Sequence, residues 1–124
     1  MRTKIDLERT PDSAAQARRA LSDVADHLTP RRLEDARLLV SELVTNAIRH
    51  AGLNDHQAIK LTISPRAGGL RIEVRDPGRG FELSEPDPDP GRPSGWGLYL
   101  VSELSDRWGV DRSGDTRVWF ELDS

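Results

Sequence analysis

The stretch LLVSELVTNAIRHAG, residues 38–52, decides the fold that we predict for this chain. Its apolar residues recur every three or four positions, as on one face of an α-helix. Glu42, Asn46 and His50 recur every four positions, so they form one polar row along the same helix. Because an apolar residue directly follows each of them, the row borders the apolar face. It is either solvated surface or the wall of a pocket, and the stretch alone leaves both interpretations open.

Composition limits the classes of function. With 124 residues, the chain is expected to form a single domain, residues 1–124. A formal net charge of −3 gives no basic excess, which argues against a direct nucleic-acid partner. The absence of cysteine excludes disulfides and thiolate metal sites, and it fits a reducing cytoplasm. No apolar run is long enough to span a membrane, so we predict a cytoplasmic protein without a membrane partner.

Helix signals precede the central stretch. The pairs Thr10–Pro11 and Thr29–Pro30 each place an N-cap residue before a proline suited to the first helical position. The first pair predicts a helix over residues 11–27. The second predicts the helix that contains the central stretch and ends at Gly52. Weak alternation over residues 4–8 indicates a short edge strand.

The apolar period changes to two after the central stretch. Residues 59–64 and 70–75 alternate, which predicts an antiparallel hairpin with its turn over 65–69. A third helix is expected to open at Gly95, with Leu98, Val101, Leu104 and Trp108 on one side. Two further strands, 109–111 and 116–122, complete the pattern, the last with Val118, Phe120 and Leu122 inward. The predicted fold class is α+β, a two-layer α/β sandwich with helices on one face of a mixed, mostly antiparallel sheet.

Two glycine motifs lie at the ends of predicted elements. Asp76-x-Gly78-x-Gly80 is either ordinary turn chemistry or a carboxylate beside a ligand, since a purine amino group donates well to a carboxylate. Gly95-x-Gly97-Leu98 opens a helix, whose free N–H groups suit phosphate. No P-loop lysine follows, so the phosphate charge would need a cation. Glu42 and Asn46 suggest magnesium, which prefers a few oxygen ligands with water and phosphates.

These three motifs together resemble the GHKL (Bergerat-fold) ATP-binding superfamily. Glu42-x-x-x-Asn46-Ala47-x-x-His50 resembles its N box, and the two glycine motifs resemble its G1 and G2 boxes. The short domain and the run over residues 97–101 are similar to stand-alone anti-sigma-factor serine/threonine kinases. The resemblance covers nearly the whole chain and implies ATP and Mg²⁺ as cofactors.

The resemblance also implies roles for individual residues. Asn46 would ligate magnesium, and Glu42 would be the catalytic residue, orienting or deprotonating the attacking hydroxyl. Asp76 would bind the adenine amino group, with Thr116 helping through a water. His50 would either touch phosphate or cap the helix end. The other nucleotide-binding positions are expected to shape the adenine pocket or to offer backbone N–H groups: Gly78, Gly80, Gly95, Gly97 and Leu98.

Residues 81–95 would form the ATP lid. The segment from Glu82 to Ser94 contains four prolines and four acidic residues, and its only basic residue is Arg92. Acidic side chains repel a triphosphate, so Arg92 is expected to offset part of that repulsion together with magnesium.

The resemblance implies a function and leaves alternatives. The first is an ATP-binding anti-sigma regulatory factor, a protein serine/threonine kinase that phosphorylates an anti-anti-sigma (STAS-type) partner and sequesters a sigma factor. The second is a non-catalytic nucleotide-dependent protein-binding module, and the third is a detached histidine-kinase ATPase domain. Glu42 favours the kinase, since a pure binder needs no base, and the lack of a preceding phosphoacceptor helix disfavours the third. The resemblance also allows a homodimer.

Overall fold

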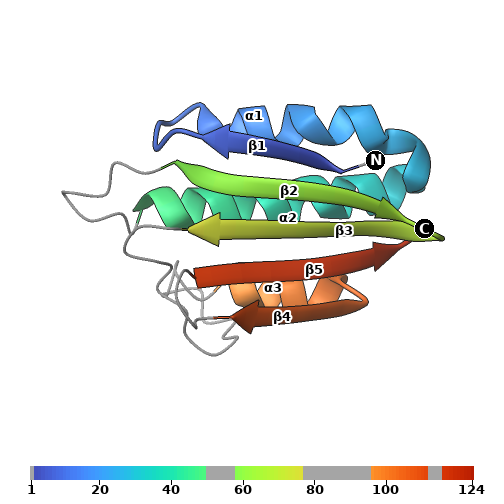
Figure 1. The fold of residues 1–124 in the computed structure, drawn as a ribbon. Coiled ribbons are helices and arrows are strands. Elements are labelled where there is room, and N and C mark those ends of the chain that lie inside the picture. Colours follow the sequence, from blue (N-terminus) through green and yellow to red (C-terminus); the bar gives the residue numbers. More distant parts are fainter. Residues whose placement is uncertain (1, 50–57, 77–95, 112–115) are drawn as a thin grey trace.

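The computed structural model describes residues 2–49, 58–76, 96–111 and 116–124. Their strands form a five-stranded sheet in the order β1-β2-β3-β5-β4, with every described pairing antiparallel (Figure 1). The predicted α+β sandwich is therefore confirmed, and the described sheet is antiparallel rather than mixed. The elements in chain order are β1 (Thr3–Leu7), α1 (Ser13–Ala20), the 3₁₀ helix η1 (Leu21–His27), α2 (Pro30–Arg49), β2 (Ile59–Arg66), β3 (Gly69–Asp76), α3 (Trp96–Leu104), β4 (Arg107–Asp111) and β5 (Thr116–Asp123).

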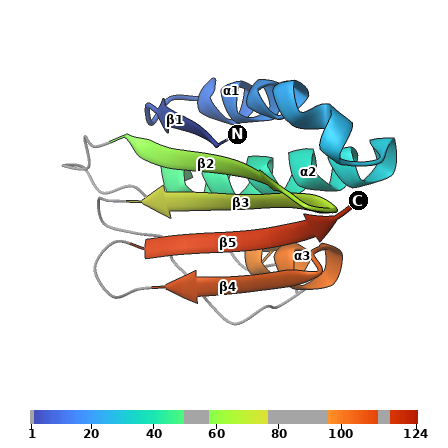
Figure 2. The same cartoon turned by 45° about the vertical axis from the view of Figure 1, so that its right-hand side comes forward.

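The helices cover one face of the sheet, and the core lies between the two layers (Figure 2). Helix α2 packs against α1, α3, β3 and β5 and is thus the centre of the helical layer. Strand residues alternate between the faces, so Val118, Phe120 and Leu122 point into the core as predicted. They meet the fully buried apolar face of α2, which includes Leu39 and Val44.

The start of α2 follows the prediction. Pro30 is its first residue, and the Arg32 N–H donates to the Thr29 hydroxyl at 3.3 Å. Thr29 therefore caps the helix, and proline occupies a position whose missing N–H would have no partner within the helix. The cap fixes where α2 begins, and the burial of its apolar face fixes the side on which the polar row lies.

The first predicted helix is divided. It begins at Ser13 rather than Pro11 and tightens at Leu21 into η1. The Ser13 hydroxyl donates to the Glu8 carbonyl and lies 3.3 Å from the Thr10 hydroxyl, so these groups form a local turn before the helix starts. Within η1, Val24 has φ −119° and ψ 16°, which interrupts the helical path.

Two further boundaries differ from the prediction. Strand β2 continues to Arg66 and strand β3 begins at Gly69, so the hairpin turn is shorter than the predicted residues 65–69. Gly68 in the turn has a positive φ of 76°, which glycine adopts readily. Trp108 does not extend the face of α3. Asp106, two residues earlier, donates its N–H to the Glu121 carbonyl at 2.9 Å, and the β4–β5 pairing that follows places Trp108 opposite Phe120.

A buried carboxylate joins three arginines on the sheet face away from the helices. Glu121 accepts from Arg107 at 2.6 Å and from Arg71 at 3.0 Å, and it is also ion-paired with Arg66. The pKa of Glu121 is lowered, chiefly by the hydrogen bond from Arg107, with Arg71 and Arg66 adding to it. The cluster ties β2, β3, β4 and β5 together.

Among the described helices, none is long and apolar enough to cross a membrane.

Candidate functional site

The polar row of α2 lies where the helix borders the core. Asn46 is 8% exposed, and Glu42, one turn earlier, is half-buried. Residues four apart on a helix have Cβ atoms roughly 5–6 Å apart, so the two side chains lie on one line along α2. Asn46 is flanked in sequence by the exposed Thr45 and the fully buried Ala47. Of the two interpretations of this row, the burial of Asn46 favours the wall of a pocket.

Asn46 carries a buried oxygen without a partner. Within the described residues, its side-chain Oδ1 accepts no hydrogen bond. Such a buried, unpaired polar atom costs free energy, about 1–3 kcal/mol, and therefore needs an explanation. A neutral amide oxygen is a suitable magnesium ligand. In the described part of the chain, no group of three His, Cys, Asp or Glu residues forms a metal site. The donor set thus fits an ion completed by water and phosphate oxygens.

Asp76 ends β3 on the helix side of the sheet. Its carboxylate is 1% exposed and forms a two-pronged ion pair with Arg9. The same Arg9 nitrogen, Nη1, donates to Asp76 Oδ2 at 3.4 Å and to the Ala47 carbonyl of α2 at 3.3 Å. One guanidinium therefore bridges the end of β3 and the turn of α2 that carries Asn46. Asn46 and Asp76, which are 30 positions apart in the sequence, therefore lie in the same region of the fold.

The partner strand adds Thr116. It is the first residue of β5 and pairs directly with Asp76 across the β3–β5 ladder. On the other side of α2, helix α3 packs against it, with Gly97 in its first turn and Leu98 buried at 8% exposure. Thus β3, β5 and α2 supply Asp76, Thr116 and Asn46 to one region, and α3 borders the same helix.

The remaining predicted site residues lie outside the described residues. These are His50, Gly78, Gly80, Arg92 and Gly95, and the whole of the proposed lid over 81–95 also lies outside the described residues. Their expected roles stay predictions.

Sequence reasoning missed Arg9. It precedes α1 in a segment without periodicity, and its partner Asp76 lies 67 positions away. A buried carboxylate such as that of Asp76 needs a cation, but the sequence contains many arginines and no pattern in it selects Arg9. Arg9 follows β1, and the tertiary fold brings this segment to the end of β3, where Asp76 lies.

Comparison with known proteins agrees with this architecture. Residues 7–122 match the family model described as the histidine kinase-like ATPase domain. The chain is 30% identical over 111 residues to the serine-protein kinase RsbW of Oceanobacillus iheyensis, covering 77% of this chain and 70% of that protein. It is 31% identical over 122 residues to RsbW of Bacillus subtilis, covering 87% and 76%. The chain belongs to the histidine kinase-like ATPase domain family, and within it resembles serine-protein kinases.

Solved structures show the same fold. The structure of the RsbU and RsbW domains of a Mycobacterium tuberculosis protein matches with a TM-score of 0.75 at 21% identity, over 99% of this chain. This chain spans 32% of that one, so the likeness concerns the fold of one part of it. The histidine kinase domain of a blue-light activated kinase from Erythrobacter litoralis matches less closely, with a TM-score of 0.57 at 26% identity, over 89% of this chain and 60% of that one.

Proposed function

We propose that the protein is an ATP-binding anti-sigma regulatory factor, a serine/threonine kinase that phosphorylates an anti-anti-sigma partner and otherwise sequesters a sigma factor. The observation that carries the proposal is the buried Oδ1 of Asn46, which accepts no hydrogen bond within the described residues and lies one turn from Glu42, next to the Ala47 carbonyl that Arg9 joins to Asp76. Similarity to two serine-protein kinases, of whose length the match covers 70% and 76%, supports the activity. The nature of the two protein partners rests on the resemblance to anti-sigma kinases.

Each residue would have a separate task in the reaction. Asp76 would accept the adenine amino group, helped by Thr116, while Asn46 would give one oxygen ligand to magnesium. The bound ion supplies charge neutralisation for the phosphates. The serine oxygen of the partner attacks the γ-phosphorus, the bond from that phosphorus to the β–γ bridging oxygen breaks, and ADP leaves. Glu42 takes the proton of the attacking hydroxyl.

The phosphates would be bound chiefly by main-chain donors. Gly95, Gly97 and Leu98 would offer N–H groups at the start of α3, where the helix dipole favours negative charge. Gly78 and Gly80 would let the backbone approach the base closely. We assign Arg92, on the lid over 81–95, to the phosphates, and we leave His50 with its two roles, phosphate contact or helix-end cap.

The half-buried Glu42 favours the kinase over a non-catalytic binding module. Within the described residues its side chain makes no hydrogen bond or ion pair, so the carboxylate is not engaged by another polar group there. A catalytic base must be available to the attacking hydroxyl, and an unengaged carboxylate meets that requirement. The detached histidine-kinase domain is less well supported, because three similar proteins are named serine-protein kinases.

A paired measurement on Glu42→Gln tests the proposal. Phosphoryl transfer from radiolabelled ATP to a STAS-type partner is expected to fall about a hundredfold or more, the usual contribution of a general base. ATP affinity, measured by calorimetry, should stay within about twofold, because Gln keeps the size and polarity of the side chain. Glu34→Gln, an exposed position on the same helix, is the matched control and should change neither quantity. Binding of ATP and partner without any transfer by the wild type would establish the binding module instead.

A further inference from the structure

The sheet face away from the helices carries a line of like charges. Lys60 pairs with Arg75 across β2 and β3, and Arg75 pairs with Arg117 across β3 and β5. We call these three residues the cation row. Side chains of directly opposed residues lie close together, and like charges there destabilise a sheet. The register therefore places three cations side by side, a repulsion that a bound anion would lower.

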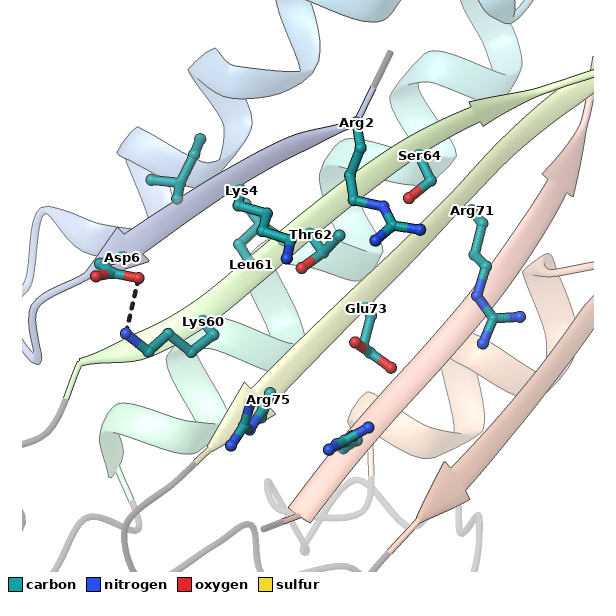
Figure 3. Close-up of a pocket in the computed structure, with 12 residues that line it drawn as sticks. Arg2, Lys4, Asp6, Lys60, Leu61, Thr62, Ser64, Arg71, Glu73 and Arg75 are labelled. Carbon is teal, nitrogen blue, oxygen red and sulfur yellow. Dashed lines mark hydrogen bonds and ion pairs between the residues drawn. The ribbon is translucent and has the colours of Figure 1, made fainter.

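The cation row borders a cavity of about 550 Å³ on this face (Figure 3). Its lining contains six basic and two acidic side chains, whereas the whole chain has a formal net charge of −3. The figure shows Lys4 and Arg2 reaching from the β1 side over β2, and Arg71 and Arg75 rising from β3. Positive charge is therefore concentrated on this face against the overall sign of the protein.

Several of these cations have no internal carboxylate to neutralise them. Within the described residues, Arg2, Lys4 and Arg117 form no ion pair or hydrogen bond through their side chains. Lys60 contacts Asp6 at 3.0 Å, but both are well exposed, and such a pair contributes little. Arg71 is engaged, since it donates to Glu121 and stacks over Trp119 at 4.2 Å. The face thus offers positive charge to an anionic partner from outside.

The acidic residues on this face restrict what that partner is. Asp6 lies beside Lys60 at one end of the cation row, and Asp111 lies beside Arg117 at the other. Glu73 lies on β3, two residues before Arg75, and lines the cavity floor. A nucleic-acid backbone carries a negative charge at every phosphate, so phosphates beyond the cation row would be repelled by these carboxylates. A polypeptide can place a neutral residue opposite Glu73 and acidic residues opposite the cations.

A second copy of this chain fits the face poorly. If two such faces stacked with their cation rows superimposed, the like charges would disfavour the interface.

We propose that the cavity beside the cation row is a docking surface for an acidic segment of a partner protein, separate from the site around Asn46 and Asp76. The partner's carboxylates contact Lys60, Arg75 and Arg117, and Lys4 closes the β1 side. Glu73 selects segments in which the acidic residues are interrupted. This surface does not depend on phosphoryl transfer, so it stands or falls independently of the kinase proposal.

Binding of a defined peptide tests this. The probe is a fluorescein-labelled ten-residue peptide of alternating glutamate and serine, titrated by anisotropy at 50 mM and 500 mM salt. We expect measurable binding at low salt that weakens at high salt. The double variant Lys60→Gln/Arg117→Gln should weaken it about tenfold, because two charge pairs are lost. The control Arg19→Gln/Arg31→Gln removes equal charge from exposed helix positions and should stay within about twofold.

A second variant, in which peptide affinity is expected to rise, excludes loss of folding as the cause of the weaker binding. Glu73→Gln removes the repelling carboxylate from the cavity floor and should tighten peptide binding severalfold. Unchanged binding in this variant, or equal losses in the double variant and its control, would overturn the proposal. So would tighter binding of a ten-nucleotide oligothymidylate than of the peptide through the same two residues. Sedimentation that shows a dimer in the wild type and a monomer in the double variant would assign the face to a second copy and also overturn it.

Discussion

Arg9 and Asp76 form a buried ion pair that joins the segment before α1 to the last residue of β3. Their side chains are 9% and 1% exposed, and Arg9 also donates to the Ala47 carbonyl of α2. Three elements distant in the sequence therefore meet at one guanidinium.

Removing one member of this pair should be costly. Arg9→Met leaves a buried carboxylate without its cation, and we expect the free energy of unfolding to fall by about 3–5 kcal/mol. Urea denaturation followed by circular dichroism measures it. Arg9→Met combined with Asp76→Leu should recover part of the loss, because no charge is then left unpaired. Arg19→Met, at an exposed position of α1, is the control. A loss no larger than in the control would contradict a structural role for the pair.

Local patterns predicted the elements better than their contacts. The period of residues 38–50 and the alternation of 59–64 and 70–75 are repeated many times, so α2 and the β2–β3 hairpin followed directly from the sequence. The division of the first helix at Leu21 and the strand position of Trp108 depend on single hydrogen bonds or a single dihedral angle, which periodicity does not register.

The site was predictable only in part for the same reason. Asn46 and Asp76 were selected by motifs, and Thr116 follows from the resemblance. Arg9 meets a partner 67 positions away, and the cation row is defined by sheet order and register, so neither is contained in a short stretch. Their charges were visible in the sequence, but their proximity was not.

Asn46 should show a trade between stability and binding. In Asn46→Ala the unpaired buried oxygen is gone and a better helix former takes its place, so the free energy of unfolding should rise by about 0.5–2 kcal/mol. Calorimetry should show weaker ATP binding in the presence of magnesium and little change in its absence. Equal affinity of wild type and variant with magnesium would rule out Asn46 as a ligand of the ion.

Asp76 should set the preference for adenine. Asp76→Asn keeps the shape of the side chain but supplies an amide that donates to the guanine oxygen, whereas the carboxylate only accepts. The ratio of ATP to GTP affinity should fall about tenfold or more, as expected for loss of a charge-assisted hydrogen bond. Competition between the two nucleotides on one protein sample measures the ratio. A folded variant with the wild-type ratio would refute the assignment.

Acid should destabilise the protein through Glu121. Its pKa is lowered in the folded state, so the stabilisation is fully present above the ordinary glutamate pKa, near 4.3, and is lost as pH falls through the folded-state value. Asp106 acts in the same direction, because the Asp123 N–H donates to it at 2.7 Å and lowers its pKa. Unfolding free energies measured by urea titration from pH 7 to pH 3 should therefore fall mainly below about pH 4.5.

The matched variant is Glu121→Gln. It should be less stable than the wild type at pH 7, since three arginines lose their carboxylate, and it should lose less stability on acidification. Glu103→Gln, at an exposed position of α3, should keep the wild-type pH profile. Parallel profiles for Glu121→Gln and the wild type would show that Glu121 does not titrate in this range.

The alternation of β3 and β5 limits how this protein can diverge. Asp76 and Thr116 face the helices, while their immediate neighbours Arg75 and Arg117 face the other way. Inserting or deleting one residue in either strand would exchange these neighbours between the faces and damage both surfaces in one event. Substitutions can therefore change the helix-facing surface or the opposite surface separately, one side chain at a time. Insertions and deletions are tolerable only outside this pair of strands.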